Sequence, residues 1–246
     1  MKIALLGYGK MGQIIERFAL ERGHEVVLKI NSRNQDELNV TNLSKADVAI
    51  DFSVPDAAIP NIYLCFEANV PIVVGSTGWY GQLQEVKDAC LSRNNTLLYG
   101  SNFSIGVNIF FHINQVLAKV MNNFPAYDVQ VEEIHHTQKL DSPSGTAMTI
   151  AESIIDELDS KKEWVNELVG SPFEDVVKKD QVLIESHRIE HVPGTHTVVY
   201  SSEVDDIEIK HTAHNRAGFA LGAIVAAEWL QNKQGFYNIA DIFNFK

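Results

Sequence analysis

Cysteine and positive charge are both scarce in this 246-residue sequence. The only cysteines, Cys65 and Cys90, have neither the spacing of a metal site nor that of a disulfide framework. We therefore expect two reduced thiols, as is usual in the cytosol. The sequence has 20 Lys and Arg residues but 32 Asp and Glu residues, so its formal net charge is −12. This balance argues against a nucleic-acid partner, because neutralising phosphates requires a basic surface.

Long hydrophobic runs, internal repeats and low-complexity segments are also absent. The longest late apolar run, 219–227, is too short to span a bilayer. The opening "MKIALLGYGKMG" has a lysine and a short apolar run, but not the length or cleavage region of a signal peptide. A hydrophobic content of 45% is that of an ordinary globular protein. We expect a cytoplasmic protein without a membrane partner.

The first hundred residues alternate short apolar runs with helical patterns. Strands are expected at 2–6, 25–30, 47–52, 71–75 and 96–100, and helices from about residue 14 and at 57–68 and 82–92. Apolar strands separated by helices indicate a parallel sheet that is covered on both faces. Right-handed crossovers make such a sheet doubly wound, which is the Rossmann-type arrangement.

The pattern changes after residue 102. We expect helices at 109–122 and 144–158, strands at 128–134, 182–191, 196–202 and 207–211, and a final apolar helix at 217–230. The charged segment 159–180 is weakly patterned and is expected to form a surface loop or helical excursion. Consecutive strands with short connections predict a second, α+β domain with an antiparallel or mixed sheet. The final helix is expected to pack back on the first domain.

A glycine-rich turn joins the first strand to the first helix. The run Gly7-Tyr8-Gly9-Lys10-Met11-Gly12 has the G-x-G-x-x-G spacing of dinucleotide-binding turns. In such turns the first glycine permits a tight turn, the second lets the backbone approach a pyrophosphate, and the third allows close helix–strand contact. The N–H groups of the helix N-terminus would hold the phosphates. We favour dinucleotide binding over a merely structural turn.

The end of the second strand bears on which dinucleotide is bound. An NAD site normally places an acid there, whereas this sequence has Ser32 and Arg33, with Lys29 nearby. A hydroxyl and a guanidinium suit a 2′-phosphate, so NADPH is favoured. NADH remains an alternative, and so does a solvated loop with no role in binding.

Two further loops follow expected strand ends. One contains Gly75, Ser76 and Thr77, and the other contains Gly100, Ser101, Asn102 and Phe103. Ligands of an open parallel sheet bind at the carboxyl ends of its strands. Each loop could be a simple turn, but together they favour contacts with a nicotinamide. The segment "DFSVP", 51–55, is similarly placed.

The segment "EEIHHTQKLDSPSGTA", 132–147, holds the second group of candidate residues. His135, His136 and Lys139 are followed by Ser144-Gly145-Thr146 at the start of an expected helix. The histidines and lysine can move protons and offer positive charge, and the N–H groups of the helix start can hold a carboxylate. The rival interpretations are a polar strand end and a metal site.

A metal site is the less favoured interpretation. Adjacent histidines on a strand point to opposite faces, so His135 and His136 cannot easily share one ion. The five later histidines show no companion carboxylate or cysteine pattern: His187, His191, His196, His211 and His214. His187 and His191 are expected at the surface or an interface. His196 and Arg216 could reach a substrate or could serve only as structural contacts.

The order of these motifs resembles one family. The glycine turn, "GSTG", "NFSIGVN", "HHTQKLDSPSGTA", "PGTHT" and "IKHTAHNRAGFALGA" together resemble the dihydrodipicolinate (4-hydroxy-tetrahydrodipicolinate) reductases over nearly the whole chain. The resemblance implies a dinucleotide-binding domain at 1–103 and 217–246. It also implies a substrate-binding and oligomerisation domain at 104–216, whose sheet assembles a homotetramer. The implied activity is hydride transfer from NAD(P)H to a cyclic dicarboxylate in the diaminopimelate route to lysine.

The resemblance also implies roles for individual residues. His135 matches the family's proton donor, Lys139 its catalytic lysine, and His136 its substrate-binding histidine, while Gly145 and Thr146 match a pair that binds substrate through the backbone. The segments 7–12, 75–77 and 100–103 match those that contact the nucleotide. Two positions depart from the family: Ser32 stands where an acid is frequent, and Gln138 replaces a frequent histidine. The region between the second and third strands is also shorter than usual.

Two other functions compete with this reductase. One is a different two-domain NADP dehydrogenase acting on a small amino or keto acid. The other is a nucleotide-sensing protein without turnover, although no basic nucleic-acid-binding element is visible in the sequence.

Overall fold

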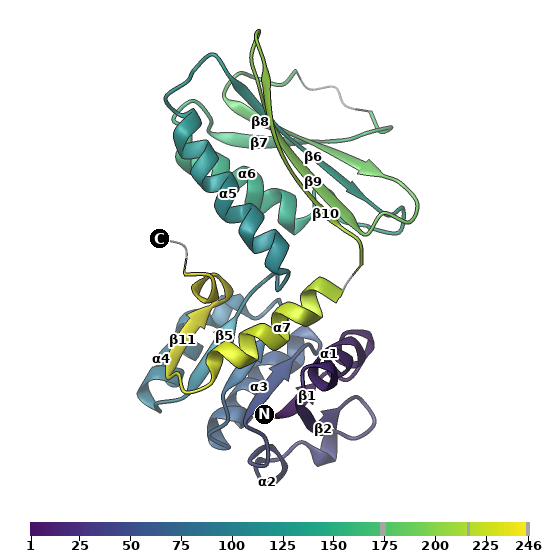
Figure 1. Cartoon of the computed structure of the whole chain (residues 1–246), viewed down its shortest axis with the longest axis vertical. Helices are drawn as coiled ribbons and strands as arrows, with labels where there is room; N and C mark the ends of the chain where they lie inside the picture. Colours follow the sequence, from purple (N-terminus) through teal and green to yellow (C-terminus); the bar gives the residue numbers. More distant parts are fainter. Residues whose placement is uncertain (173–175, 216, 245–246) are drawn as a thin grey trace. The chain divides into compact units, whose positions relative to one another are not determined.

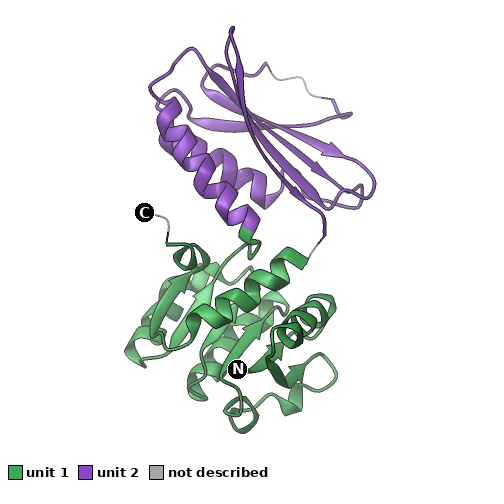
Figure 2. Cartoon of the chain, in the orientation of Figure 1, with its two compact units in different colours: residues 1–105, 217–246 green, residues 106–216 purple. Residues whose placement is uncertain are grey.

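The computed structural model of the chain describes residues 1–172, 176–215 and 217–244. These residues form two compact units (Figure 2). The first unit combines Met1–Ile105 with Ala217–Lys246, and the second is Gly106–Arg216. No helix in the described ranges combines the length and the hydropathy that crossing a membrane requires.

The first unit contains a six-stranded sheet in the order β11-β5-β4-β3-β1-β2 (Figure 1). All of its neighbouring strands run parallel. The strands are β1 (Lys2–Leu6), β2 (Glu25–Ile30), β3 (Val48–Asp51), β4 (Ile72–Val74), β5 (Thr96–Tyr99) and β11 (Gly235–Asn238). The five predicted strands are confirmed. β11 was not predicted, because its four half-buried residues carry no alternating or continuous apolar pattern.

Helices cover both faces of this sheet. They are α1 (Lys10–Glu21), α2 (Val40–Leu43), α3 (Pro55–Glu67), α4 (Leu83–Ser92) and α7 (Ala217–Leu230), with short 3-10 turns η1 (Gln35–Glu37), η2 (Tyr80–Gln82) and η3 (Ile239–Ile242). Alternate residues of β1 point to opposite faces. Leu6 packs in one core with Ile62 of α3, and Leu5 packs in the other with Ile224 of α7. The doubly wound arrangement is therefore confirmed.

The second unit is a mixed sheet with two helices. The strand order is β10-β9-β6-β8-β7, with β6 (Asp128–His135), β7 (Glu163–Leu168), β8 (Gln181–Arg188), β9 (Gly194–Ser201) and β10 (Asp206–Ala213). β8 runs parallel to β6 and β7, whereas β9 runs antiparallel to β6 and β10. The helices α5 (Ile105–Met121) and α6 (Gly145–Glu157) share one apolar core with the sheet.

Two predictions for this unit are wrong. The segment 159–180, predicted as a loop or helix, contains the edge strand β7. Its residues "EWVNEL" are exposed or only half-buried, so the pairing with β8, rather than its own pattern, makes it a strand. The strand predicted to reach His191 ends at Arg188. His191 has φ of 64°, in the left-handed region, which interrupts an extended strand.

Candidate active site

The glycine turn is packed as its spacing predicts. Gly7 follows β1 with φ of +91°, and a Cβ there would lie 2.4 Å from the carbonyl oxygen of Phe52. A Cβ at Gly12 would lie 2.8 Å from the carbonyl oxygen of Gly7, so α1 approaches the turn closely. A Cβ at Gly9 would have no neighbour within 4 Å. Gly9 is also the N-cap of α1, and no side chain caps it, which leaves the helix N-terminus suited to an anion.

A cavity of about 530 Å³ opens beside this turn. It lies at the carboxyl ends of β1, β2 and β3, where open parallel sheets bind ligands. Its volume is that of a small-molecule or cofactor site. Its lining comprises Gly7, Tyr8, Gly9, Lys10, Met11, Ile30, Asn31, Ser32, Gln35, Phe52, Ser53, Val54, Ala57 and Asn61.

The lining agrees only in part with the predicted nucleotide contacts. Ser32 lines the cavity, whereas Arg33 is exposed next to it, with its backbone N–H donating to Asn31 Oδ1 at 2.8 Å. Lys29, considered as a second cation, lies with its Nζ 2.6 Å from Glu16 Oε1. The sequence did not point to the amides Asn31, Gln35 and Asn61, which come to the cavity from the end of β2, from η1 and from α3.

The other predicted loops follow β4 and β5 at the same edge of the sheet, but they are not part of the cavity lining. A Cβ at Gly75 would lie 2.3 Å from the Phe52 ring, and one at Gly100 would lie 2.7 Å from Ile239, so both glycines allow close packing. Ser76 is buried and donates to the Ser53 carbonyl at 3.2 Å, and Phe103 packs edge-on against Phe52. Thr77 and Ser101 are exposed, and Asn102 Oδ1 accepts from the Ser104 N–H at 2.9 Å.

A buried carboxylate contacts one of the side chains that line the cavity. Asp51, the last residue of β3, is fully buried, and its Oδ1 accepts from Asn61 Nδ2 at 3.2 Å. Burial raises the pKa of Asp51. Asn61 also reaches the Ser53 hydroxyl at 3.3 Å. Asp51 thus helps to place two side chains that line the cavity.

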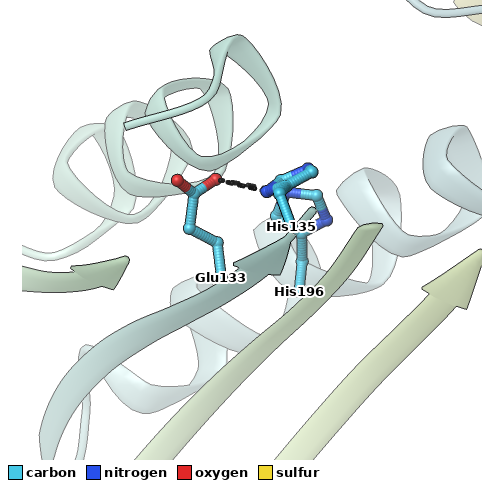
Figure 3. A group of neighbouring side chains, drawn as sticks. All are labelled: Glu133, His135 and His196. Carbon is cyan, nitrogen blue, oxygen red and sulfur yellow. Dashed lines mark ion pairs between the residues drawn. The ribbon is translucent and has the colours of Figure 1, made fainter. Parts of the chain in front are cut away.

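The second site lies at the end of β6, where Glu133, His135 and His196 meet (Figure 3). Glu133 and His135 are two residues apart on one strand, so their side chains share a face. His196 lies opposite Glu133 on β9. Glu133 Oε2 is 3.4 Å from His135 Nδ1 and 3.7 Å from His196 Nε2, and the two imidazole rings meet edge to face at 5.1 Å. All three residues are buried.

Glu133 accepts hydrogen bonds from several directions. The Ser144 N–H donates to both carboxylate oxygens at 3.1 Å, and the Ser186 hydroxyl donates to Oε1 at 2.8 Å. Arg188 Nη1 lies 3.5 Å from Oε1. Burial acts to raise the pKa of Glu133, but the interaction with His135 and the hydrogen bonds from Ser144 and Ser186 outweigh it and lower the pKa to about 2. Glu133 is therefore an ionised carboxylate inside the unit.

His196 belongs to the same network. Burial and then the charge of His135 lower the pKa of His196 to about 3, so its ring is neutral near pH 7. Its Nε2 lies 3.2 Å from the Ser144 hydroxyl. The prediction that the later histidines lack a companion carboxylate is thus wrong for His196. Its partner Glu133 lies 63 residues earlier in the sequence, so spacing could not reveal it.

The contacts of Glu133 favour a hydrogen-bonded network over a metal centre. The three side chains offer ligand atoms within 4.8 Å of one another. However, both oxygens of Glu133 already accept hydrogen bonds, and the Arg188 guanidinium supplies the compensating positive charge. A second cation at the same carboxylate would meet repulsion from Arg188.

The start of α6 lies beside this network. Ser144 is the N-cap, and its hydroxyl accepts from the Ala147 N–H at 3.1 Å. Gly145 and Thr146 form the first turn, as predicted, and a Cβ at Gly145 would have no neighbour within 4 Å. The N-terminus of α6 therefore has open space beside Gly145, and a helix N-terminus of this kind suits a carboxylate ligand.

Lys139 and His136 lie in the connection between β6 and α6. The Lys139 N–H donates to the His136 carbonyl at 3.1 Å, which closes a turn directly after the strand. Lys139 Nζ is 2.7 Å from Asp141 Oδ2, and this hydrogen bond lowers the pKa of Asp141. His136 is half-buried. His135, His136, Lys139 and the start of α6 thus come from one continuous segment.

The remaining histidines are less tightly placed. His187 is half-buried on β8, and His191 and His214 are exposed. Arg216, which was considered as a possible substrate contact, lies outside the described residues.

A parallel doubly wound sheet with a glycine turn and an adjoining cavity, joined to a second unit rich in proton-transfer groups, defines a pyridine-nucleotide-dependent oxidoreductase. Models of the dihydrodipicolinate reductase N-terminus and C-terminus match residues 1–103 and 106–243. The chain belongs to the dihydrodipicolinate reductase family. Its sequence is 47% identical to the 4-hydroxy-tetrahydrodipicolinate reductase of Christiangramia forsetii over 244 residues, which cover 99% of this chain and 98% of that protein.

Solved structures share the fold. A dipicolinate-bound dihydrodipicolinate reductase from Paenisporosarcina sp. TG-14 has a TM-score of 0.79 at 24% identity and covers 98% of this chain and 99% of its own. A probable dehydrogenase from Thermotoga maritima has a TM-score of 0.60 at 9% identity, with coverages of 98% and 92%. An engineered D-amino acid dehydrogenase bound to NADP+ has a TM-score of 0.51 at 13% identity, with coverages of 98% and 93%.

Proposed function

We propose that this protein reduces 4-hydroxy-tetrahydrodipicolinate with NAD(P)H and gives tetrahydrodipicolinate. Membership of the reductase family and the full-length relative in Christiangramia forsetii support this activity. The observation that carries it is a buried cluster of His135, an ionised Glu133 and Ser144, the N-cap of α6, beside the more exposed first turn of that helix. That cluster joins a proton source to an anion site, and the reduction of a cyclic dicarboxylate requires both.

The cofactor-binding residues follow from the glycine turn and the cavity beside it. We assign the pyrophosphate to the turn and the N-terminus of α1, through Gly7, Tyr8, Gly9, Lys10, Met11 and Gly12. The open space at Gly9 and the uncapped helix start support this assignment. When bound, NAD(P)H supplies the hydride, and the protein supplies binding and orientation.

We favour NADPH over NADH. Ser32 lines the cavity and Arg33 follows it, so a hydroxyl and a guanidinium are available near the ribose of a bound nucleotide. Acids are the usual ribose ligands of NAD sites at this strand end, and β2 is followed here by Asn31, Ser32 and Arg33 instead. We further assign the nicotinamide end to the loops at 75–77 and 100–103, which follow β4 and β5 at the same sheet edge.

The substrate is proposed to bind at the start of α6. Gly145 and Thr146 would hold one carboxylate through backbone N–H groups and the helix dipole. Ser144, whose own N–H donates to Glu133, would support this site as the N-cap of α6. His136 adds a polar contact from the end of β6. The dipicolinate described in the Paenisporosarcina relative is a dicarboxylate of the expected kind.

His135 and Lys139 are proposed to supply the proton. A positioned histidine or lysine can protonate a reacting group as hydride arrives. Lys139 contacts Asp141, an exposed partner, and a substrate carboxylate can take the place of Asp141 beside its ammonium. This exchange would bring the lysine to the substrate without breaking a buried contact.

The remaining proposals concern the cell and the assembly. The family resemblance supports a homotetramer and a place in the diaminopimelate route to lysine. The two free, buried cysteines fit a reducing compartment such as the cytoplasm. Light scattering of the purified protein measures the assembly, for which we expect a mass of four 27.5 kDa chains.

A coupled assay tests the activity. NADPH oxidation followed at 340 nm should require the product of dihydrodipicolinate synthase and should cease when the synthase is omitted. The same assay with NADH measures the cofactor preference. Absence of substrate-dependent oxidation with either cofactor would overturn the proposed function.

A further inference from the structure

Glu133 is an unusual residue for the interior of the second unit. It is fully buried, and it is ionised. Burying a charge is unfavourable unless the charge is paired and hydrogen-bonded, and an apolar side chain of similar size is often the more stable choice. The fold nevertheless directs a backbone N–H, a hydroxyl and a guanidinium at this carboxylate. This arrangement points to a role in function rather than in stability.

One side of Glu133 faces His135. The imidazole Nδ1 is buried and lies 3.4 Å from Glu133 Oε2, an ion-pair contact rather than a well-formed hydrogen bond, and within the described residues it has no hydrogen-bond partner. The Nε2 edge of the ring faces Gly194, where a Cβ would lie 3.1 Å from Nε2. The glycine therefore leaves the Nε2 edge without a covering side chain. The carboxylate on one edge and a glycine without a side chain on the other favour a proton on Nδ1 and proton exchange at Nε2.

The other side of Glu133 faces the anion site. The Ser144 N–H donates to both carboxylate oxygens, which fixes the N-cap of α6. His196 contacts the Ser144 hydroxyl and lies 3.7 Å from Glu133 Oε2. Arg188 lies beside Oε1 and donates to the Asp141 carbonyl at 2.7 Å. The segment between β6 and α6, which carries Lys139, is thus tied near both ends to one carboxylate.

We propose that Glu133 is a positioning residue for the reduction. Its carboxylate keeps one proton of the doubly protonated His135 on Nδ1, so that the imidazolium gives its Nε2 proton to the substrate and is left as the neutral Nδ1–H ring. Glu133 also fixes the first turn of α6, where the substrate carboxylate binds. This inference rests on the proposed roles of His135 and of the start of α6. Glu133 itself does not touch the substrate.

The decisive variant is Glu133→Gln, which keeps the volume but turns one acceptor into an N–H donor. That donor would face His135 Nδ1 and favour the opposite tautomer. A wrong tautomer at a comparable catalytic histidine lowers turnover by about 10⁴-fold, and we expect kcat to fall by at least roughly 10²-fold. The Kd for NADPH should stay within about twofold of the wild-type value, since the cofactor turn belongs to the other unit. Glu133→Asp, which keeps the charge, should recover part of the lost kcat.

The matched control is Glu132→Gln, the same substitution one residue earlier on the opposite face of β6. It should keep kcat, KM and the thermal midpoint close to the wild-type values. If Glu133→Gln behaves like this control, the inference is wrong while the proposed function stands.

A spectroscopic measurement separates positioning from a purely structural role. Long-range proton–nitrogen correlation spectra of protein labelled with ¹⁵N-histidine identify the tautomer of each neutral ring, and the His135 signals are those lost in His135→Asn. We expect the Nδ1–H form of His135 in the wild-type protein and the Nε2–H form in Glu133→Gln. An Nε2–H form in the wild-type protein would overturn the inference even if Glu133→Gln failed to fold. This measurement does not depend on catalysis. It therefore tests whether Glu133 sets the tautomer of His135 even if the wild-type protein shows no activity in the NADPH assay.

Discussion

The Lys139 ammonium lies 2.7 Å from the Asp141 carboxylate, two residues further along the same connection. The side chain of Lys139 is 18% exposed and that of Asp141 is 63% exposed, so water screens the pair from one side. Such a pair contributes about 0–1 kcal/mol. Asp141 therefore holds Lys139 near the start of α6 without binding it too firmly to be displaced.

We expect Asp141→Asn to ease substrate binding. Without its ionic partner, Lys139 is free to meet a substrate carboxylate, and the KM for substrate should fall by up to about fivefold, the factor that corresponds to roughly 1 kcal/mol. The thermal midpoint should change little. Steady-state kinetics and thermal unfolding of the purified variant measure both quantities. A large rise in KM would instead mean that Asp141 contacts the substrate or holds the loop in its active form.

Lys139→Ala should lose mainly turnover. A lost general acid lowers the rate by about 10²–10⁴-fold, and the free energy of unfolding should hardly change because the ion pair is weak. Lys162→Ala is a suitable control, since Lys162 forms an exposed pair with Asp180 within the same unit. Full activity of Lys139→Ala would show that His135 alone supplies the proton.

Gly9→Ala tests the phosphate site without disturbing the fold. A Cβ at this position meets no protein atom within 4 Å, and an N-cap change of this kind costs less than about 1 kcal/mol. The methyl group would occupy space needed by a pyrophosphate, so the KM for NADPH should rise by roughly tenfold, equivalent to about 1.4 kcal/mol. Gly81→Ala is the matched control, because Gly81 also has open space but lies outside the cavity lining. If the two variants have equal kinetic constants for NADPH, the glycine turn is not part of the cofactor-binding site.

Arg33→Ala should affect the two cofactors differently. A hydrogen bond to a charged group contributes about 1.5–3 kcal/mol, so kcat/KM with NADPH should fall by roughly tenfold or more. The value with NADH should change little, because NADH lacks the 2′-phosphate. Arg17→Ala, on the exposed surface of α1, provides the control. Equal losses with both cofactors would contradict a 2′-phosphate role for Arg33.

Stability should fall as the pH is lowered from neutrality. His196 has a folded-state pKa of about 3, well below its usual value of 6.5, so the unfolded chain binds a proton first and stability declines from about pH 6.5 towards pH 3. Glu133, with a pKa of about 2 instead of 4.5, acts in the same direction between about pH 4.5 and pH 2. Urea unfolding at a series of pH values measures this loss. His196→Gln should make the free energy of unfolding less dependent on pH above pH 4.5, and Glu133→Gln should do so below pH 4.5. If neither variant changes the pH dependence, the lowered pKa values of His196 and Glu133 are contradicted.

Local patterns were sufficient to predict most of the fold. Continuous apolar runs and helical periodicity depend on neighbouring residues, and they placed β1 to β5, α4, α6 and α7 close to their observed bounds. β7 and β11 were not predicted. They are short, half-buried edge strands, and their conformation depends on pairing with β8 and β5, which lie elsewhere in the sequence. The candidate segment 135–146 was found for the same local reason, since its histidines, lysine and helix start are consecutive.

The sequence by itself thus determined the two-unit α/β organisation, the glycine turn and the segment from His135 to Thr146, because each of them follows from a pattern of residues that are close together in the sequence. Only the tertiary structure decided that Glu133 faces His135, that His196 joins them from β9, and that Ser186 and Arg188 complete the network from β8. These partners are brought together by the register of three strands, and burial then alters the ionisation of Glu133 and His196. Strand register and burial are properties of the packed sheet, so no single stretch of the sequence carries them.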